Sequence, residues 1–313
     1  AQTDARTGLE ALASTFSSPP QEAALHYENG ALVAIPGEFG YTINIEDTLA
    51  LLRQKPLVVL FRGQLSLTLR PVLPRVSDLS PLLLQAQQML AAPRSISFYD
   101  PITNETFQRE IPPEILASWL SADTSGETPR LSIVSANVMQ YLQQESLSFN
   151  PERFFNPEDW VQAIAAVFDE APLPTILLQH NPTSYTVQAG DTLLKIGLKS
   201  GMPYWRIANA NPEVNPDQLF TGQALVIPSK DDLMPLPIVA NKRIVISINK
   251  QRLWAYENGQ EVARHVISTG IDRSPTQPGV FQVQTHVKNA YASIWDLTMP
   301  DFLGIYEAWP GFM

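Results

Sequence analysis

The sequence predicts a multidomain α+β protein: an α/β N-terminal domain, a strand-helix-helix-strand (βααβ) module and a mainly-β C-terminal part. Three observations predict it. The 313 residues exceed the usual length of one domain. Proline-containing breaks interrupt the chain at 181–183 and 234–237. The apolar pattern becomes strictly alternating after Arg243. We therefore expect a helix and linker over 1–20, domains at 21–180, 184–229 and 241–313, and a second linker over 230–240.

Composition and charge limit the classes of partner. Apolar residues make up 44% of the chain and charged residues 17%, as in folded globular proteins. The net charge is −10; residues 1–180 hold 20 acidic and 10 basic groups, and residues 181–313 hold 11 of each. Because this count shows no basic stripe, we expect neither nucleic acid nor an anionic lipid surface as partner. A neutral glycan fits better, although an acidic surface is more often a solubility feature.

Several chemistries are absent from the sequence itself. There is no Cys, which excludes disulfides, thiolate metal sites and Cys nucleophiles within these residues. No apolar run approaches the roughly 18 residues of a membrane span. The chain also lacks metal-ligand spacing and the serine-hydrolase motifs. We expect no metal, no cofactor and no membrane span in this chain.

The first domain mixes strands and helices. Ala31–Gly37 reads as a strand and turn, and Ile45–Gln54 as a helix. Leu65–Leu69 alternates strictly and is the clearest predicted strand. Ser80–Leu90 is a predicted helix with Ser80 as N-cap. Further expected elements are a strand at 95–99, helices at 113–120, 137–144 and 157–168, and a strand at 176–179.

Three short runs in this domain carry a resemblance. They are Ile35-Pro36-Gly37-Glu38-Phe39-Gly40, Ile45-Glu46-Asp47-Thr48 and Val72-Leu73-Pro74-Arg75-Val76. On these, residues 21–125 resemble the peptidoglycan-binding domain found upstream of L,D-transpeptidase domains and in VanW-like surface proteins. The alternative is a spacer domain with an unknown partner.

Residues 184–229 show the order strand, helix, helix, strand. Tyr185–Val187 and Leu225–Ile227 are the expected strands. Gly190 permits a tight turn, and Asp191 or Thr192 can cap the helix that starts at Leu193. A second helix should begin near 203 and end before Asn211-Pro212.

This module resembles LysM over its whole length. The residues that carry the resemblance are Tyr185, Val187, Gly190, Asp191, Thr192, Leu193, Ile196, Ile207, Asn209, Asn211, Pro212, Leu219, Gly222, Gln223, Leu225, Ile227 and Pro228. The resemblance implies a groove for N-acetylglucosamine-containing polymers between two loops, with contacts at Gly190, Asp191, Thr192, Leu193, Asn211, Pro212 and Leu219. The alternative is that most of these residues are structural, with Leu193 in the core and Asp191 and Asn211 acting as caps.

The last part reads as strands. Residues 244–248 alternate, residues 251–256 and 262–268 are expected to pair across a hairpin turn at 257–260, and 280–283 is a further expected strand. This part resembles the first half of a YkuD-type L,D-transpeptidase domain. The residues that carry the resemblance are Val245, Ile248, Gln251, Leu253, Ala255, Tyr256, Asn258, Gly259, Ser268, Thr269, Gly270, Thr276, Pro278, Gly279 and Phe281; the inserted Gln277 departs from the pattern.

The resemblance implies that the domain is incomplete here. The family acts through a Cys in a Ser-His-Gly-Cys motif, which forms a thioester with a stem peptide. That Cys lies outside this chain, so we expect no catalytic residue in it, and His265 and His286 are expected to be ordinary strand residues. Trp295, Met299, Tyr306 and Trp309 belong to an aromatic-rich tail that could line a donor groove. The alternative is packing against the rest of the domain.

Two functions remain open. The first is an extracytoplasmic, cell-wall L,D-transpeptidase that is anchored to peptidoglycan glycan strands and cross-links stem peptides. The second is a non-catalytic peptidoglycan-binding protein with a degenerate transpeptidase-like end. A Ser-His-Gly-Cys motif beyond Met313 would decide for the first.

The lack of Cys generates a prediction. We expect the 313-residue chain to form no covalent adduct with a carbapenem, because no thiolate is present to attack it. Intact-mass spectrometry after incubation measures this. A stoichiometric adduct would reveal a nucleophile of another kind.

Overall fold

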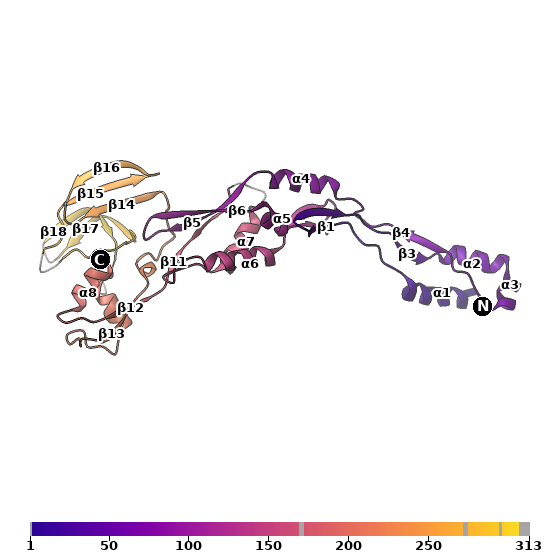
Figure 1. Ribbon diagram of the computed structural model, residues 1–313, viewed down its shortest axis with the longest axis horizontal. Helices are drawn as coiled ribbons and strands as arrows, with labels where there is room; N and C mark the ends of the chain where they lie inside the picture. Colours follow the sequence, from indigo (N-terminus) through magenta and orange to yellow (C-terminus); the bar gives the residue numbers. More distant parts are fainter. Residues whose placement is uncertain (1, 169–171, 272–274, 294–295, 307–313) are drawn as a thin grey trace. The chain divides into compact units, whose positions relative to one another are not determined.

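The computed structural model describes residues 2–168, 172–271, 275–293 and 296–306 (Figure 1). It has helices and many small sheets, which confirms the α+β class. The chain divides into two compact units. Unit 1 comprises Ala1–Ile96, Gln108–Gln143 and Pro157–Pro174, and unit 2 comprises Ser97–Phe107, Gln144–Asn156 and Thr175–Met313. No helix within the described residues is long and apolar enough to cross a bilayer.

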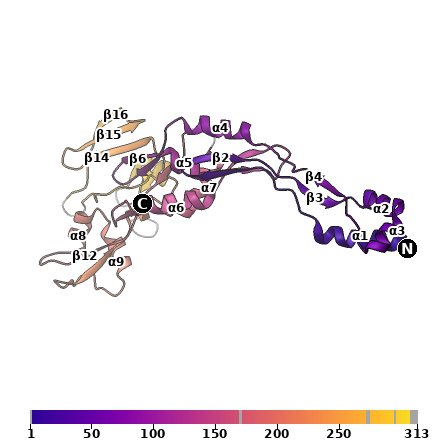
Figure 2. The same ribbon diagram turned by 45° about the vertical axis from the view of Figure 1, so that its right-hand side comes forward.

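Unit 1 consists of two-stranded antiparallel ladders and short helices (Figure 2). Its pairs are β1–β2, β3–β4 and β7–β8. Its elements, wholly or mainly, are α1 (Gln2–Phe16), β1 (Ala24–Glu28), β2 (Ala31–Ile35), β3 (Gly40–Ile43), α2 (Ile45–Gln54), α3 (Pro56–Arg62), β4 (Leu69–Val72), α4 (Ser80–Leu90), α5 (Pro113–Trp119), β7 (Leu120–Asp123), β8 (Arg130–Ile133), α6 (Ser135–Ser146) and α7 (Pro157–Ala166).

A buried tryptophan organises the core of unit 1. Trp119 is fully buried at the end of α5, and its ring lies 5.3 Å from that of Tyr141 and 6.0 Å from that of Phe168. Val138 of α6 and Ile164 of α7 are also buried, so both helices contribute to this core. Apolar residues that recur with the helical period of 3.6 residues lie on one face of each helix, and these faces together form one core.

The motif runs of this unit meet in space. The N–H of Gly37 donates to Ser77 O at 3.0 Å, and Glu22 accepts from the N–H groups of Arg75 and Val76. A Cβ on Gly37 would lie 2.7 Å from Val76 O. Glycine therefore lets the two segments approach at this point.

Two predictions for unit 1 were wrong. Only Leu69 of the predicted strand at 65–69 is in a strand, because its partner β3 ends at Ile43, directly opposite Leu69. Beyond that point Asn44 caps α2, so no strand remains for the earlier residues to pair with. The N-cap of α4 is Leu79 rather than Ser80; the Asp78 carboxylate accepts from both the N–H and the hydroxyl of Ser80.

Unit 2 contains the remaining strands and four short helical segments, α8, α9, η1 and the end of α6, within the described residues. Its sheets are β10-β5-β6, with β10 parallel to β5, then β11-β9, β12-β13, β14-β15-β16 and β17-β18. Strands β5 (Arg94–Asp100) and β6 (Glu105–Ile111) are divided between the two units. The other elements of unit 2 are β9 (Arg153–Phe154), β10 (Thr175–Leu177), β11 (Gln179–His180), β12 (Thr183–Thr186), α8 (Leu193–Ser200), α9 (Tyr204–Ala210), β13 (Ala224–Ile227), η1 (Lys230–Leu233), β14 (Lys242–Ser247), β15 (Arg252–Glu257), β16 (Gln260–Val266), β17 (Thr285–Ala292) and β18 (Leu297–Gly304).

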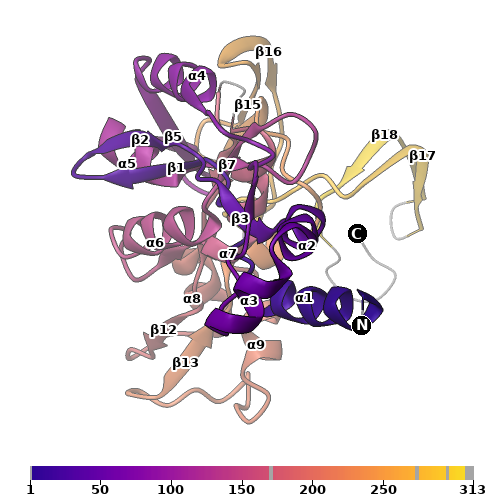
Figure 3. The same cartoon turned by 90° about the vertical axis from the view of Figure 1, so that its right-hand side faces the viewer.

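The C-terminal strands differ from expectation after β16. Residues 280–283 are not a strand. The chain instead forms a hairpin of β17 and β18, paired from Thr285↔Gly304 to Ala292↔Leu297. Figure 3 shows this hairpin projecting away from β15 and β16. The predicted turn at 257–260 is confirmed, with positive φ at Asn258 and Gly259.

The βααβ module shares its core with the segment that follows β16. The buried side chains are Val187, Leu193, Ile196, Met202, Ile207, Leu225, Ile227 and Leu233, the last of them from η1. Phe281 packs against this core. A Cβ on Gly279 would lie 2.7 Å from Gly201 O, so the two backbones touch. Residues 280–283 thus do not pair as a strand, and Phe281 among them covers the core of the module.

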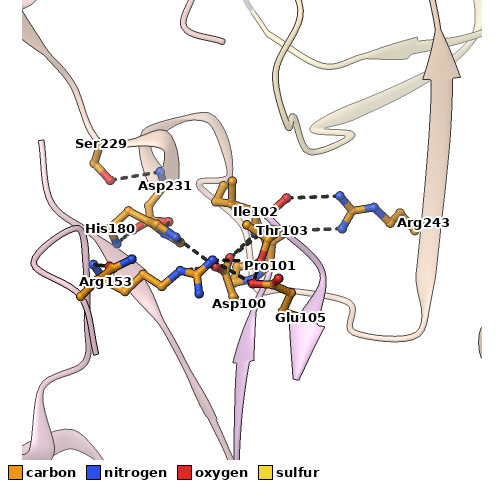
Figure 4. Close-up of polar contacts among 11 residues, drawn as sticks. Asp100, Pro101, Ile102, Thr103, Glu105, Arg153, His180, Ser229, Asp231 and Arg243 are labelled. Atoms are coloured by element: carbon orange, nitrogen blue, oxygen red, sulfur yellow. Dashed lines mark hydrogen bonds and ion pairs between the residues drawn. The ribbon is translucent and has the colours of Figure 1, made fainter. Parts of the chain in front are cut away.

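A charged cluster joins β5, β9, β11, η1 and β14 of unit 2 (Figure 4). The buried Asp100 carboxylate, at the end of β5, pairs with Arg153 Nε at 2.9 Å and with His180 Nε2 at 3.4 Å. The carboxylate of Asp231, in η1, accepts a hydrogen bond from the backbone N–H of His180 at 2.6 Å. It also lies 3.1 Å from the ring Nδ1 of the same histidine. Arg243 donates to the carbonyls of Pro101 and Ile102, both at 3.3 Å.

The two carboxylates determine the charge of His180. Burial by itself lowers the pKa of His180, but its hydrogen bonds to Asp100 and Asp231 raise that pKa to about 9. Burial likewise raises the pKa of Asp100, yet the bonds from His180 and Thr103 bring it well below its usual range. His180 is therefore a charged histidine at neutral pH.

This charge generates a prediction on pH. Folding raises the pKa of His180 from 6.5 to about 9. The stabilisation of the folded state by the charged His180 is therefore complete below pH 6.5, and it disappears as the pH rises through 9. We expect the free energy of unfolding to fall by on the order of 3 kcal/mol across this window. Urea unfolding at several pH values measures it.

His180→Gln should remove most of that slope. His286→Gln is the control, because His286 is exposed and pairs only with the exposed Asp301 among the contacts described. The explanation fails if the slope between pH 6.5 and 9 survives in His180→Gln.

The shared core generates a second prediction. We expect Phe281→Ala to destabilise unit 2 by about 2 kcal/mol, since a half-buried ring leaves the core. Phe220→Ala is the control, because Phe220 is 63% exposed; its effect should stay within about 0.5 kcal/mol. Denaturant unfolding followed by tryptophan fluorescence compares the two, and equal effects would contradict the packing role of Phe281.

Candidate functional site

The candidate glycan-binding site lies on the βααβ module. Strands β12 and β13 pair antiparallel from Thr183↔Ile227 to Thr186↔Ala224. Hydrogen bonds between Val187 and residues 222 and 223 continue the ladder. Helices α8 and α9 lie between these strands in sequence, as predicted. The two loops that were expected to bind glycan therefore extend from a small closed core.

The first loop is a turn fixed at its glycine. Gly190 has φ +80°, and no atom lies within 4 Å of the position that a Cβ would take. Thr192 caps α8, since its Oγ1 accepts from the Lys195 N–H at 3.3 Å. Lys195 Nζ in turn donates to Gly190 O at 2.9 Å. Gly190 and Thr192 are exposed, whereas the Leu193 side chain is buried in the core.

Asp191 is the centre of a hydrogen-bond network beneath this turn. Its carboxylate accepts from Lys199 Nζ at 2.8 Å, from the Gln188 N–H at 3.0 Å and from the Tyr185 hydroxyl at 2.8 Å. These bonds, that of Lys199 first, lower the pKa of Asp191 to about 2. Its side chain is only 4% exposed. Asp191 therefore holds the turn together, and Thr192 provides the cap.

The second loop begins at an asparagine whose amide is fully engaged. Asn211 Nδ2 donates to Ile207 O at 2.7 Å and to Val226 O at 2.8 Å, and its Oδ1 accepts from the Val226 N–H at 2.8 Å. It thus ties the end of α9 to β13. Pro212 is exposed, and Leu219 packs partly against the core.

The two lysines of α8 were missed in the sequence. Lys195 and Lys199 are four residues apart on one helix face, and both reach back to the turn at residues 190–191. The available signal was a pair of basic residues, four and eight positions after the Asp of the Gly-Asp turn. Only the turn geometry shows which acceptors these amines meet.

The motif residues of the C-terminal part are brought together by side-chain hydrogen bonds. Gln251 accepts from the Thr269 N–H at 2.9 Å, and its amide also donates to Ile248 O at 2.6 Å. Thr276 Oγ1 accepts from the Gly270 N–H at 2.8 Å. The hydroxyl of Thr269 is bonded to Gln251 as well. Gln251 therefore ties the start of the loop after β16 to the turn that precedes β15, and Thr276 closes that loop on itself.

The predicted donor-groove residues are only partly placed. Trp295 and Trp309 lie outside the described residues. Met299 is half-buried in β18. The ring of Tyr306 lies 5.1 Å from that of Trp205 and 5.2 Å from that of Phe281, and burial raises its pKa. Tyr306 thus packs against α9.

The described histidines and acids do not form a metal centre. No group of three or more such side chains among the described residues could hold an ion. His265 and His286 are exposed on strands.

Comparisons with known proteins agree with this geometry. A family model of the LysM domain matches residues 185–228. A model of the L,D-transpeptidase catalytic domain, YkuD, matches residues 241–310. A Bacillus licheniformis protein classed as an L,D-transpeptidase, YkuD, is 29% identical over 105 residues, which are 34% of this chain and 61% of that protein. The chain thus spans less than two thirds of the length of this relative.

Two solved structures are also similar. One is a mutant of the Enterococcus faecium L,D-transpeptidase, with 15% identity, a TM-score of 0.29, and coverage of 73% of this chain and 79% of that one. The other is a MoCVNH3 variant in complex with (N-GlcNAc)4, with 24% identity, a TM-score of 0.15, and coverage of 28% and 55%. Both TM-scores are too low to support an argument. The sequence matches show a LysM domain at 185–228, followed by residues of an L,D-transpeptidase catalytic domain at 241–310.

Proposed function

We propose that this chain binds peptidoglycan through its LysM domain. The match at 185–228, on a module with the expected strand-helix-helix-strand order, is the observation that carries the proposal. An extracytoplasmic location at the cell wall follows from this role. Residues 21–180 are proposed as a further wall-binding domain on the motif runs alone.

The glycan would contact the rims of the two loops. Exposed backbone at Gly190 and Thr192 can exchange hydrogen bonds with the acetamido groups of N-acetylglucosamine. Exposed Pro212 and half-buried Leu219 offer apolar surface on the second loop. Asp191, Leu193 and Asn211 support this site from beneath, because their side chains are committed to the fold. Asp191 gives this support as a carboxylate, because its oxygens accept the hydrogen bonds from Tyr185, Gln188 and Lys199.

We further propose that the chain is part of a peptidoglycan L,D-transpeptidase that cross-links stem peptides. The match at 241–310 supports this activity. By resemblance to the family, a thiolate outside these residues attacks the donor amide carbonyl, breaks the C–N bond and forms a thioester as the amine of the following residue leaves. An acceptor amine then attacks the thioester, forms a new amide and releases the thiolate. Within this chain, Gln251 and Thr276 would fix the loop after β16, and Met299 is the described residue proposed to line the donor groove.

The binding proposal predicts a loss of affinity when the first loop is blocked. We expect Gly190→Arg to weaken co-sedimentation with purified peptidoglycan by about tenfold, because a long side chain would fill space that is open in the structure. Gly259→Arg is the matched control: its φ is +77°, nothing lies within 4 Å, and it belongs to the hairpin of β15 and β16.

Both substitutions carry the same backbone strain, so a difference between them reports the site rather than the fold. Titration with N-acetylglucosamine oligomers should show the same order of affinities. Equal binding by the two variants, or no binding by the unaltered chain, would contradict the proposed site.

A further inference from the structure

Basic residues are concentrated in one part of unit 1. Residues 48–77 contain Arg53, Lys55, Arg62, Arg70 and Arg75 and no acidic residue. They hold half of the basic groups of residues 1–180, in a chain whose net charge is −10. The count of acidic and basic residues over the whole chain, which argued against an anionic lipid partner, does not show this local concentration of basic residues.

The same segment exposes large apolar side chains. On α3, Leu57 is 65% exposed and Phe61 is 87% exposed. They are four residues apart and therefore lie on one face of the helix. Leu51, near the end of α2, and Leu69, at the start of β4, are exposed too. Single exposed apolar residues need no explanation, but several on one short segment indicate an interaction surface.

Basic groups flank this apolar face. Lys55 immediately precedes α3, and Arg62 is its last residue; both are exposed. Figures 1 and 3 show α3 beside α1 and α2 at one end of unit 1. A helix with Phe and Leu on one face and Lys or Arg at its ends has the composition of segments that lie at a membrane interface.

We propose that α3 and the last turn of α2, at one end of unit 1, dock onto the surface of an anionic phospholipid bilayer. Leu57 and Phe61 enter the boundary between headgroups and acyl chains, and Lys55 and Arg62 meet lipid phosphates. A bilayer supplies apolar volume and negative charge in one surface, and α3 presents the complement of both. The interaction is peripheral and reversible, because the insertion is limited to one short helix.

Co-sedimentation of the 313-residue chain with vesicles tests this docking. We expect binding to vesicles of phosphatidylglycerol mixed with phosphatidylcholine, much weaker binding to phosphatidylcholine alone, and a decrease at high salt. Lys55→Glu with Arg62→Glu should weaken binding by about 25-fold or more, from about fivefold per basic residue lost. Leu57→Ser with Phe61→Ser should weaken it by roughly tenfold or more.

The control is Leu147→Ser. Leu147 is 85% exposed and equally apolar, but it lies outside the basic segment, so its loss should leave binding unchanged. All substituted residues are exposed, and circular dichroism with thermal unfolding verifies that each variant folds. The salt dependence of the unaltered chain is a test that needs no variant.

Several results would overturn the proposal. They are equal binding to neutral and anionic vesicles, no binding to either, or undiminished binding by both double variants. Binding to a soluble anionic polymer such as heparin without vesicle binding would assign the surface to another polyanion. Association of the chain with itself, abolished by the same variants, would assign it to a second copy.

Discussion

The ring of Phe281 packs against the core of the LysM domain, and the attachment of this domain to the chain after β16 depends on that contact. A module of about 45 residues buries little apolar surface of its own. Leu233 and Phe281, both beyond the matched LysM residues, add to that surface. The close approach of Gly201 and Gly279 makes the contact possible. The LysM domain therefore packs against the chain segment that follows β16.

Charge strengthens the same arrangement at a second point. Buried ions are costly unless each has partners, and Asp100 has Arg153 and His180 while His180 also has Asp231. Asp231 follows the LysM strands, whereas Asp100 ends a strand that begins in unit 1. A single protonated histidine thus links segments far apart in the sequence. Its loss of charge at high pH would loosen the linker on one side of the LysM domain.

This organisation has a consequence for the proposed function. A glycan strand held on the loops at 190–193 and 211–219 would be bound by the same compact unit that contains the transpeptidase-related strands. The basic, apolar end of unit 1 lies in the other unit, so the proposed membrane docking and the proposed glycan binding by the LysM domain would use separate surfaces.

The sequence by itself determined the βααβ order, the bounds of most helices, the hairpin at 257–260 and the resemblances, because local periodicity, caps and turn residues encode them. It did not determine pairing partners. Leu65–Leu69 has a strand pattern but no strand beside it, and residues 280–283 cover the LysM core instead of joining a sheet. The roles of Asp191 and Asn211, the charge of His180 and the exposure of Phe61 were equally out of reach. Each depends on which distant atoms lie within a few ångströms, and only the tertiary structure decides that.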